Sequence, residues 1–207
     1  MLRKKLLMLL LVLVATTVSC ISANAKGKQK WVKEKKTFYA KQNIVIYKEP
    51  KCSNGNLYDT YIKGDTIKIV SSSTKWYKVK KNNYTGYILK SSKGLSKKKV
   101  SKGYRGSKLN KRNGVVNGPV GRESYYNLRM SGVISMMRDK GFSSKKYPYW
   151  VRRDGAKMLG PYVMVAACYR IHKKGSIVDT TLGQAIVCDT GGFIYSNPRG
   201  LDIAVSW

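Results

Sequence analysis

The sequence predicts a mainly β protein built of two small barrels, the second of which also carries one short helix. Three observations lead to this prediction. Short runs of alternating apolar and polar residues recur at roughly ten-residue spacing and are separated by turn residues. A single stretch in the second half has the apolar spacing of a helix. A segment rich in Lys, Gly and Ser divides the runs into two groups, as a linker does.

The first 25 residues have the pattern of a secretory signal peptide. A basic start ends at Lys5, an apolar stretch runs from Leu6 to Val14, and Ala23-Asn-Ala25 is a small-x-small cleavage site. The apolar stretch is too short to remain as a bilayer-spanning helix. We therefore expect a secreted protein with no integral membrane span after cleavage. Lipidation at Cys20 is an alternative, although the residues before it make a poor lipobox.

The chain is strongly basic, with 41 Lys and Arg against 10 Asp and Glu in 207 residues. Removing residues 1–25 removes only Arg3, Lys4 and Lys5, so 38 basic residues remain. Such a field attracts polyanions. Because export argues against nucleic acid, the expected partners are peptidoglycan and the anionic polymers of a bacterial wall. The alternative is that the lysines only keep the protein soluble.

The cysteines do not predict a disulfide framework or a metal site. After cleavage three remain, Cys52, Cys168 and Cys188, and the only histidine is His172. An odd number of widely spaced cysteines without a CxxC pair is atypical of both arrangements. We expect no metal and no cofactor, and we interpret Cys188 as a small core residue.

Residues 26–37 form a basic leader, and residues 38–95 predict the first barrel. Strands are expected at 44–47, 58–62, 66–70, 76–79 and 85–89. Asn82-Asn83 suits the tight turn of a hairpin, because asparagine tolerates positive φ.

The first barrel resembles a bacterial SH3 (SH3b) domain. Lys63-Gly-Asp-Thr-Ile-Lys-Ile69, Lys75-Trp-Tyr-Lys-Val79 and Tyr84-Thr-Gly-Tyr-Ile88 carry the resemblance. It implies binding to the cell wall or to a peptide, with Trp76, Tyr77 and Tyr87 as wall-binding candidates. The alternative is that these rings mostly fill the barrel. The opening strand, Val45 to Pro50, departs from the Asn-Val-Arg-Ser-Gly-Pro usual in such domains.

Residues 96–113 predict a basic flexible linker, and residues 114–207 are long enough for a second compact domain. Strands are expected at 123–128, 149–151, 162–168, 176–178, 184–188 and 201–207. Residues 131–140 fit a short amphipathic helix that Gly141 ends.

Two aspartates stand out in a chain with so few acids. Asp189 follows the apolar run Ala185-Ile-Val-Cys188 and enters Thr190-Gly-Gly192, while Asp202 lies within a second apolar run. A carboxyl in a partly apolar pocket has a raised pKa and can donate a proton. Equally, Asp189 can cap its own turn, since Asp before glycines often bonds the local backbone. Both interpretations remain open.

The second half is similar to the 3D domain, a six-stranded double-psi β-barrel related to MltA-type lytic transglycosylases and to RlpA. Gly183 to Gly192 matches the pattern Gly-x-Ala-x-x-x-Asp-Thr-Gly-Gly, and Leu201-Asp-Ile203 matches Ile-Asp-Leu. Ser124-Tyr-Tyr-Asn127 stands at the opening strand. Cys168 occupies the position of the first of the three aspartates that name the family, so two of the three are retained.

The resemblance implies cleavage of the bond between MurNAc and GlcNAc in peptidoglycan. Asp189 would protonate the leaving oxygen and then accept the proton of the sugar 6-hydroxyl, and Asp202 would orient Asp189 or raise its pKa. The implied substrate-binding residues are Tyr125, Tyr126, Cys168, Thr190 and Gly191. The alternative is a non-catalytic protein that binds glycan or stem peptide. An aspartic protease is disfavoured, because there is no second Asp-Thr-Gly.

Overall fold

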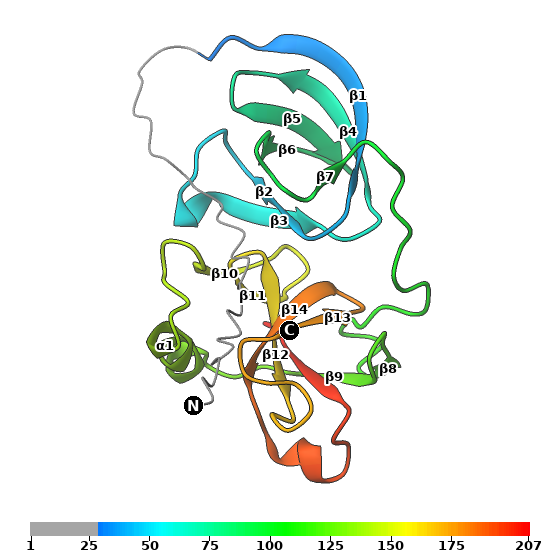
Figure 1. The fold of residues 1–207 in the computed structure, drawn as a ribbon, viewed down its shortest axis with the longest axis vertical. Helices are drawn as coiled ribbons and strands as arrows, with labels where there is room; N and C mark the ends of the chain where they lie inside the picture. The colour runs from blue at the N-terminus through cyan, green and yellow to red at the C-terminus, as the bar shows by residue number, and fades with distance from the viewer. Residues whose placement is uncertain (1–28) are drawn as a thin grey trace, which may run out of the picture.

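The computed structural model describes residues 29–207, and the predicted signal peptide and Cys20 lie outside this part of the chain. The mainly β class is confirmed. Fifteen strands form a seven-stranded and an eight-stranded sheet, one for each half of the chain, and a single α-helix belongs to the second half. The two halves stack along the long axis of the molecule, with the first half at the top of Figure 1.

The first sheet has the strand order β3-β2-β6-β5-β4-β1-β7. Its strands are β1 (Val32–Ala40), β2 (Ile44–Tyr47), β3 (Leu57–Tyr61), β4 (Thr66–Ser72), β5 (Trp76–Lys81), β6 (Tyr84–Leu89) and β7 (Leu95–Ser96), with a 3-10 turn at Asn54–Asn56. The predicted strands are therefore present with shifted ends. Asn82 has φ 51° in the β5–β6 turn, as the hairpin prediction requires. β1 begins inside the predicted basic leader.

Alternation explains the core of this half. Ile67 and Ile69 of β4, Val79 of β5 and Ile88 of β6 point inward and are buried, and polar residues between them face outward. Trp76 is only 4% exposed and makes an edge contact with Tyr47. This tryptophan therefore contributes mainly to packing.

The second sheet follows the path β10-β11-β12-β15-β9-β8, and β14 pairs with both β12 and β13. Its strands are β8 (Val116–Asn117), β9 (Arg122–Tyr126), β10 (Tyr149–Val151), β11 (Lys157–Leu159), β12 (Tyr162–Ala167), β13 (Ile177–Thr180), β14 (Gly183–Asp189) and β15 (Leu201–Ala204). The pairs β12–β14 and β9–β15 are parallel, and the others are antiparallel. Two of the eight strands, β8 and β11, were not predicted.

Helix α1 (Ser131–Asp139) covers one face of the second sheet. Met137 is buried there with Met164, Ile186 and Cys188. The helix ends at the predicted glycine, since Gly141 has φ 94° and its N–H bonds to the carbonyl of Arg138. The opposite face of the sheet packs into a separate and larger core.

Closed barrels were expected, but the strand pairing of residues 29–207 leaves both sheets open. In the first sheet β3 and β7 lie at the two ends of the path and do not pair with each other. In the second, the path ends at β10 and β8. The second sheet also has eight strands where six were expected, because the short strand β8 lies at its edge and the short strand β11 lies between β10 and β12.

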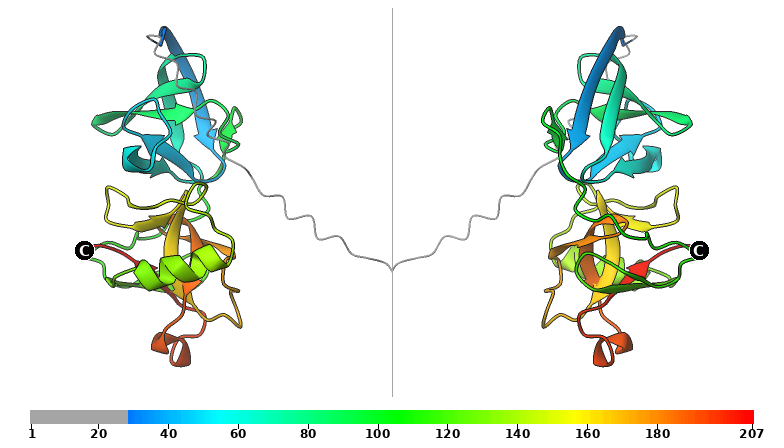
Figure 2. Two further views of the ribbon diagram at one scale, coloured as in Figure 1. Left: turned by 90° about the vertical axis from the view of Figure 1, so that its left-hand side faces the viewer. Right: turned by 90° about the vertical axis from the view of Figure 1, so that its right-hand side faces the viewer.

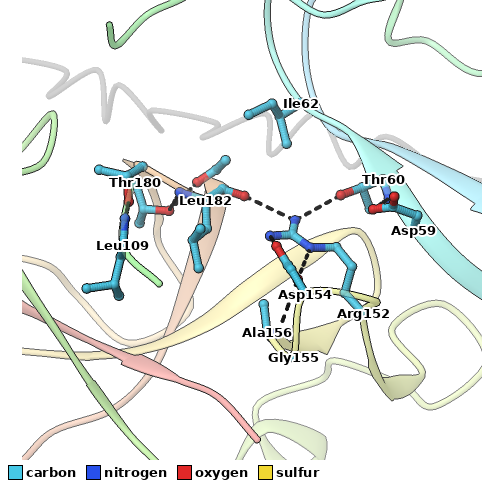
Figure 3. A network of polar contacts seen from close by, with 12 residues as sticks. Asp59, Thr60, Ile62, Leu109, Arg152, Asp154, Gly155, Ala156, Thr180 and Leu182 are labelled. Atoms are coloured by element: carbon cyan, nitrogen blue, oxygen red, sulfur yellow. Dashed lines mark hydrogen bonds and ion pairs between the residues drawn. The ribbon is translucent and has the colours of Figure 1, made fainter. Parts of the chain in front are cut away.

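A buried arginine joins the two halves (Figure 3). Arg152 is 4% exposed, and its Nη1 donates to the Thr60 hydroxyl of β3 at 2.9 Å and to the Leu182 carbonyl of the second half at 3.0 Å. Its Nε and Nη2 bond both oxygens of Asp154. The guanidinium therefore connects the halves through four directed hydrogen bonds.

A second polar contact lies at the same junction. The Asn43 side chain donates to the carbonyls of Pro161 and Gln184 at 2.8 and 2.9 Å and accepts the Gln184 N–H. Asn43 is 5% exposed, so these bonds are made out of contact with water. Together with Arg152 they fix how the first half sits on the second.

The segment predicted as a flexible linker, 96–113, is anchored to the second half. Leu109 is 2% exposed in the larger core, and its N–H donates to the Thr181 hydroxyl at 3.1 Å. The Tyr104 hydroxyl donates to the Asn117 carbonyl.

Within the described residues, no helix has the length and apolar character needed to cross a membrane.

Candidate functional site

The two candidate aspartates lie in one row across the second sheet. Ala166 of β12 pairs with Asp189 of β14 on one side and with Asp202 of β15 on the other. Asp202 in turn pairs with Ser124 of β9. Neighbouring strands lie about 4.8 Å apart, which places the two aspartate Cα atoms roughly 9.5 Å from each other. The fold therefore brings together two residues that are thirteen positions apart in the chain.

A bulge in β14 turns Asp189 toward the same face as Asp202. Val165 pairs with Val187, but the next residue, Ala166, pairs with Asp189, so Cys188 is the extra residue. Without this register shift, alternation would send Asp189 to the face opposite Asp202. Bulges of this kind re-aim a side chain. Here the shift puts both carboxylates at the edge of the small core that α1 covers.

Asp202 is half-buried and accepts a hydrogen bond from the Ser124 hydroxyl at 3.0 Å. Burial raises the pKa of the Asp202 carboxyl, and the Ser124 hydrogen bond offsets only part of this rise. A carboxyl with a raised pKa keeps its proton to higher pH. Asp202 therefore has the property required of a proton donor.

The charges of both candidate carboxylates act on the Tyr126 hydroxyl. Burial raises the pKa of its hydroxyl, and the charges of Asp189 and Asp202 both raise it further. Its buried oxygen has no hydrogen-bond partner among the described residues. Buried hydroxyls are normally bonded, so an unpartnered one calls for an explanation. An unpartnered donor that is influenced by two carboxylates is suited to a ligand or a water near them.

Asp189 is half-buried at the end of β14, and its Oδ1 accepts the N–H of exposed Thr190 at 2.9 Å. This is the local contact that the turn-cap interpretation predicts. The following glycines are not required by the backbone. Gly191 is extended (φ −159°, ψ 173°), and a Cβ at Gly192 would meet nothing within 4 Å.

The two buried cysteines differ in their surroundings. Cys168, 2% exposed at the end of β12, has its pKa lowered chiefly by the backbone N–H of Arg170. Its sulfur thus has backbone N–H donors around it. Burial raises the pKa of Cys188 to about 12. Cys188 therefore lies in the core as an unreactive thiol, as predicted.

Other candidates lie elsewhere. The Tyr125 ring packs against Trp207, with centroids 4.5 Å apart, on the larger core and away from Tyr126. Asp179 pairs with Gln184, at the opposite end of β14 from Asp189, so it lies away from the two candidate aspartates. In the first half, Tyr77 packs on Phe38, and Tyr87 contacts Trp31 at 5.4 Å. Tyr77 and Tyr87 are both half-buried.

Two residues of the site were not singled out from the sequence. Ser124 holds Asp202, and Tyr169, whose pKa rises to about 12 through burial and the Asp189 charge, donates to the Cys188 carbonyl at 3.3 Å. Only the position of Ser124 two residues before Tyr126 hinted at its orientation, since alternate residues of a strand share a face. In residues 29–207, no three His, Cys, Asp or Glu side chains gather as metal ligands would.

Comparison of the chain with protein-family models, with curated proteins and with solved structures finds no match to any of them.

Proposed function

We propose that this chain is an exported protein that acts on peptidoglycan, and that the second half cleaves the glycosidic bond between MurNAc and GlcNAc. The observation that carries the proposal is the row of Asp189, Ala166 and Asp202 with the unpartnered Tyr126 hydroxyl beside it. Two carboxyl groups in different surroundings, one of them with a raised pKa, are the arrangement that glycosidic bond cleavage uses. The strong positive charge favours an anionic wall as the partner.

The raised pKa of the Asp202 carboxyl favours roles different from those expected from the sequence. Asp202, whose pKa is raised, donates its proton to the leaving glycosidic oxygen. As the bond from MurNAc C1 breaks, the 6-hydroxyl oxygen of the same sugar bonds to C1. Asp189 accepts the proton of that hydroxyl. The product is a 1,6-anhydro sugar, no water is consumed, and solvent returns the proton from Asp189 to Asp202.

A non-catalytic wall-binding protein is the second candidate, and two observations favour it. Asp189 bonds the N–H of its own turn, and a cysteine stands where the resemblance expects a third aspartate. In this case the SH3b-like half and the second half would both bind wall polymers, and the carboxylates would help to recognise sugar hydroxyls.

The test is to incubate residues 26–207 with purified peptidoglycan and to analyse the soluble products by mass spectrometry. Cleavage as proposed gives anhydro-muropeptides, and Asp202→Asn and Asp189→Asn each lower the rate about a hundredfold or more. Asp179→Asn, on β13 beside the far end of β14, is the matched control and keeps the rate. Pelleting with the wall and no soluble product from any form would establish the binding protein instead.

A further inference from the structure

A cavity of about 300 Å³ lies at the junction of the two halves. The first half contributes residues of β2 and of the segments 52–57 and 89–94, and the second contributes residues 145–148, 160–162 and Gln184. Its size is at the lower end of the range for small-molecule sites.

The floor of this junction cavity is rigid before any ligand arrives. Asn43, Pro161 and Gln184 line it, and these are the residues that hydrogen-bond across the junction. A preformed site avoids the cost of ordering its walls on binding. The junction cavity is therefore built by both halves and held open by their contacts.

The lining carries positive charge and neutral polar groups. Lys93, Lys145 and Lys146 line the cavity, and none of the described residues around it is an Asp or a Glu. Amides and hydroxyls, including Gln42, Asn54 and Ser92, complete the polar lining. These groups suit a ligand that has both a negative charge and many hydroxyl or amide groups.

Three tyrosines, Tyr47, Tyr147 and Tyr162, are among the residues that line the cavity. Tyr47 is held by an edge contact with Trp76 at 5.3 Å, and Tyr147 by a similar contact with Phe142 at 5.0 Å. Lys146 lies 5.4 Å from the centre of the Tyr147 ring, so charge and ring are side by side. Sugar rings have flat faces of C–H groups that pack on aromatic rings.

We propose that the junction cavity binds a short anionic saccharide of one or two rings, whose charge is a carboxylate or a phosphate. This binding site is separate from the aspartate row. Gln184 and Asp189 stand at the two ends of β14, and five residues of strand at 3.3 Å each span about 16 Å. In Figure 1 the end of β14 that leads into the lower loops of the second half lies away from the first half. The proposal therefore goes beyond the cleavage reaction.

Titration calorimetry at low salt on residues 26–207 tests this site with three probes. GlcNAc–MurNAc carries a carboxylate, GlcNAc 1-phosphate carries a phosphate, and chitobiose is neutral. One of the two anionic probes is expected to bind at least tenfold tighter than chitobiose and to identify the source of the charge. Binding of neither anionic probe more tightly than chitobiose, or no binding of any probe, would overturn the proposal.

Charge variants locate the site. The double variant Lys145→Gln/Lys146→Gln is expected to bind the tighter of the two anionic probes about tenfold more weakly. The loss of each ion pair at the surface lowers the affinity about threefold. Lys97→Gln/Lys98→Gln removes the same charge from exposed residues of the 96–113 segment and leaves the affinity within twofold. An equal loss in both double variants would mean that the net charge, not the cavity, binds the probe.

A blocking variant and a chemical reporter complete the test. Asn54→Trp fills the cavity from an exposed turn and abolishes binding, whereas Ser107→Trp does not. Cys52 lines the cavity and is exposed, while Cys168 and Cys188 are buried. Bound saccharide should slow alkylation of Cys52 by iodoacetamide. Asp202→Asn is expected to bind the saccharide in the junction cavity with unchanged affinity. A failure of the proposed cleavage is therefore distinguished from a failure of the proposed binding.

Discussion

Replacement of Arg152 by methionine tests whether one buried guanidinium holds the two halves together. The substitution keeps the length of the side chain but removes hydrogen bonds to Thr60, Leu182 and Asp154. The Thr60 hydroxyl and the Leu182 carbonyl are then left without this partner in a buried place. Each such loss costs about 1–2 kcal/mol. Asp154 is half-exposed and regains water, so its loss adds little.

We therefore expect Arg152→Met to lower the free energy of unfolding by about 3 kcal/mol. The adjacent Arg153→Met is the control. Arg153 is exposed and its guanidinium stacks on Tyr84 at 4.5 Å, an interaction worth about 0.5–1 kcal/mol. Urea unfolding followed by tryptophan fluorescence measures both variants at pH 7.

A double-mutant cycle separates the Thr60 contact from the rest. Thr60→Val alone is expected to cost about 1–2 kcal/mol, and the two substitutions together should cost less than the sum of their separate effects, since they remove the same bond. If Arg152→Met and Arg153→Met are equal within 0.5 kcal/mol, or if the cycle shows no coupling, the guanidinium does not join the halves.

Three further predictions concern the second half. The pKa of Asp202 is raised in the folded protein, so the contribution of Asp202 to the free energy of unfolding should fall as pH rises above about 3.8. Urea unfolding at pH 4 and at pH 7 measures this loss, and Asp202→Asn should remove it. Leu109→Ala should cost about 2–4 kcal/mol and speed tryptic cleavage within 96–113, whereas exposed Lys111→Ala should change stability by less than 0.5 kcal/mol. Thr181→Val should cost about 2 kcal/mol in thermal unfolding, because its hydroxyl donates to buried Glu123 and accepts the Leu109 N–H, and Thr181→Ser should restore stability; an unaltered Tm for Thr181→Val would contradict this.

Much of the fold could be predicted because its strands are short and alternate. β2, β4 and β5 begin where the apolar pattern begins, and the helix ends at the glycine that the pattern marks. β1 was not predicted, since three lysines and a glutamate occupy most of its outward positions and only its last residues bury apolar groups. A strand with one weakly apolar face gives little periodic signal.

The candidate site could be predicted only as residues, not as an arrangement. Asp189 and Asp202 meet because β12 lies between their strands and because Cys188 forms a bulge, and neither fact is visible in the local sequence. The same limit holds for Arg152. It stands next to Arg153 in the chain, and only the packing of the two halves decides which one is buried.

The fixed junction sets a constant distance between the junction cavity and the aspartate row. Strands β12 and β14 run from the junction cavity to the aspartate row, so the two places are separated by a rigid strand pair of constant length. Consider a saccharide chain bound in the cavity at one end of this strand pair. The glycosidic bond that reaches the carboxylates at the other end would always lie the same number of sugar rings from the bound end. Products would then be released with one preferred length, and loosening the Arg152 contacts would broaden the distribution of lengths.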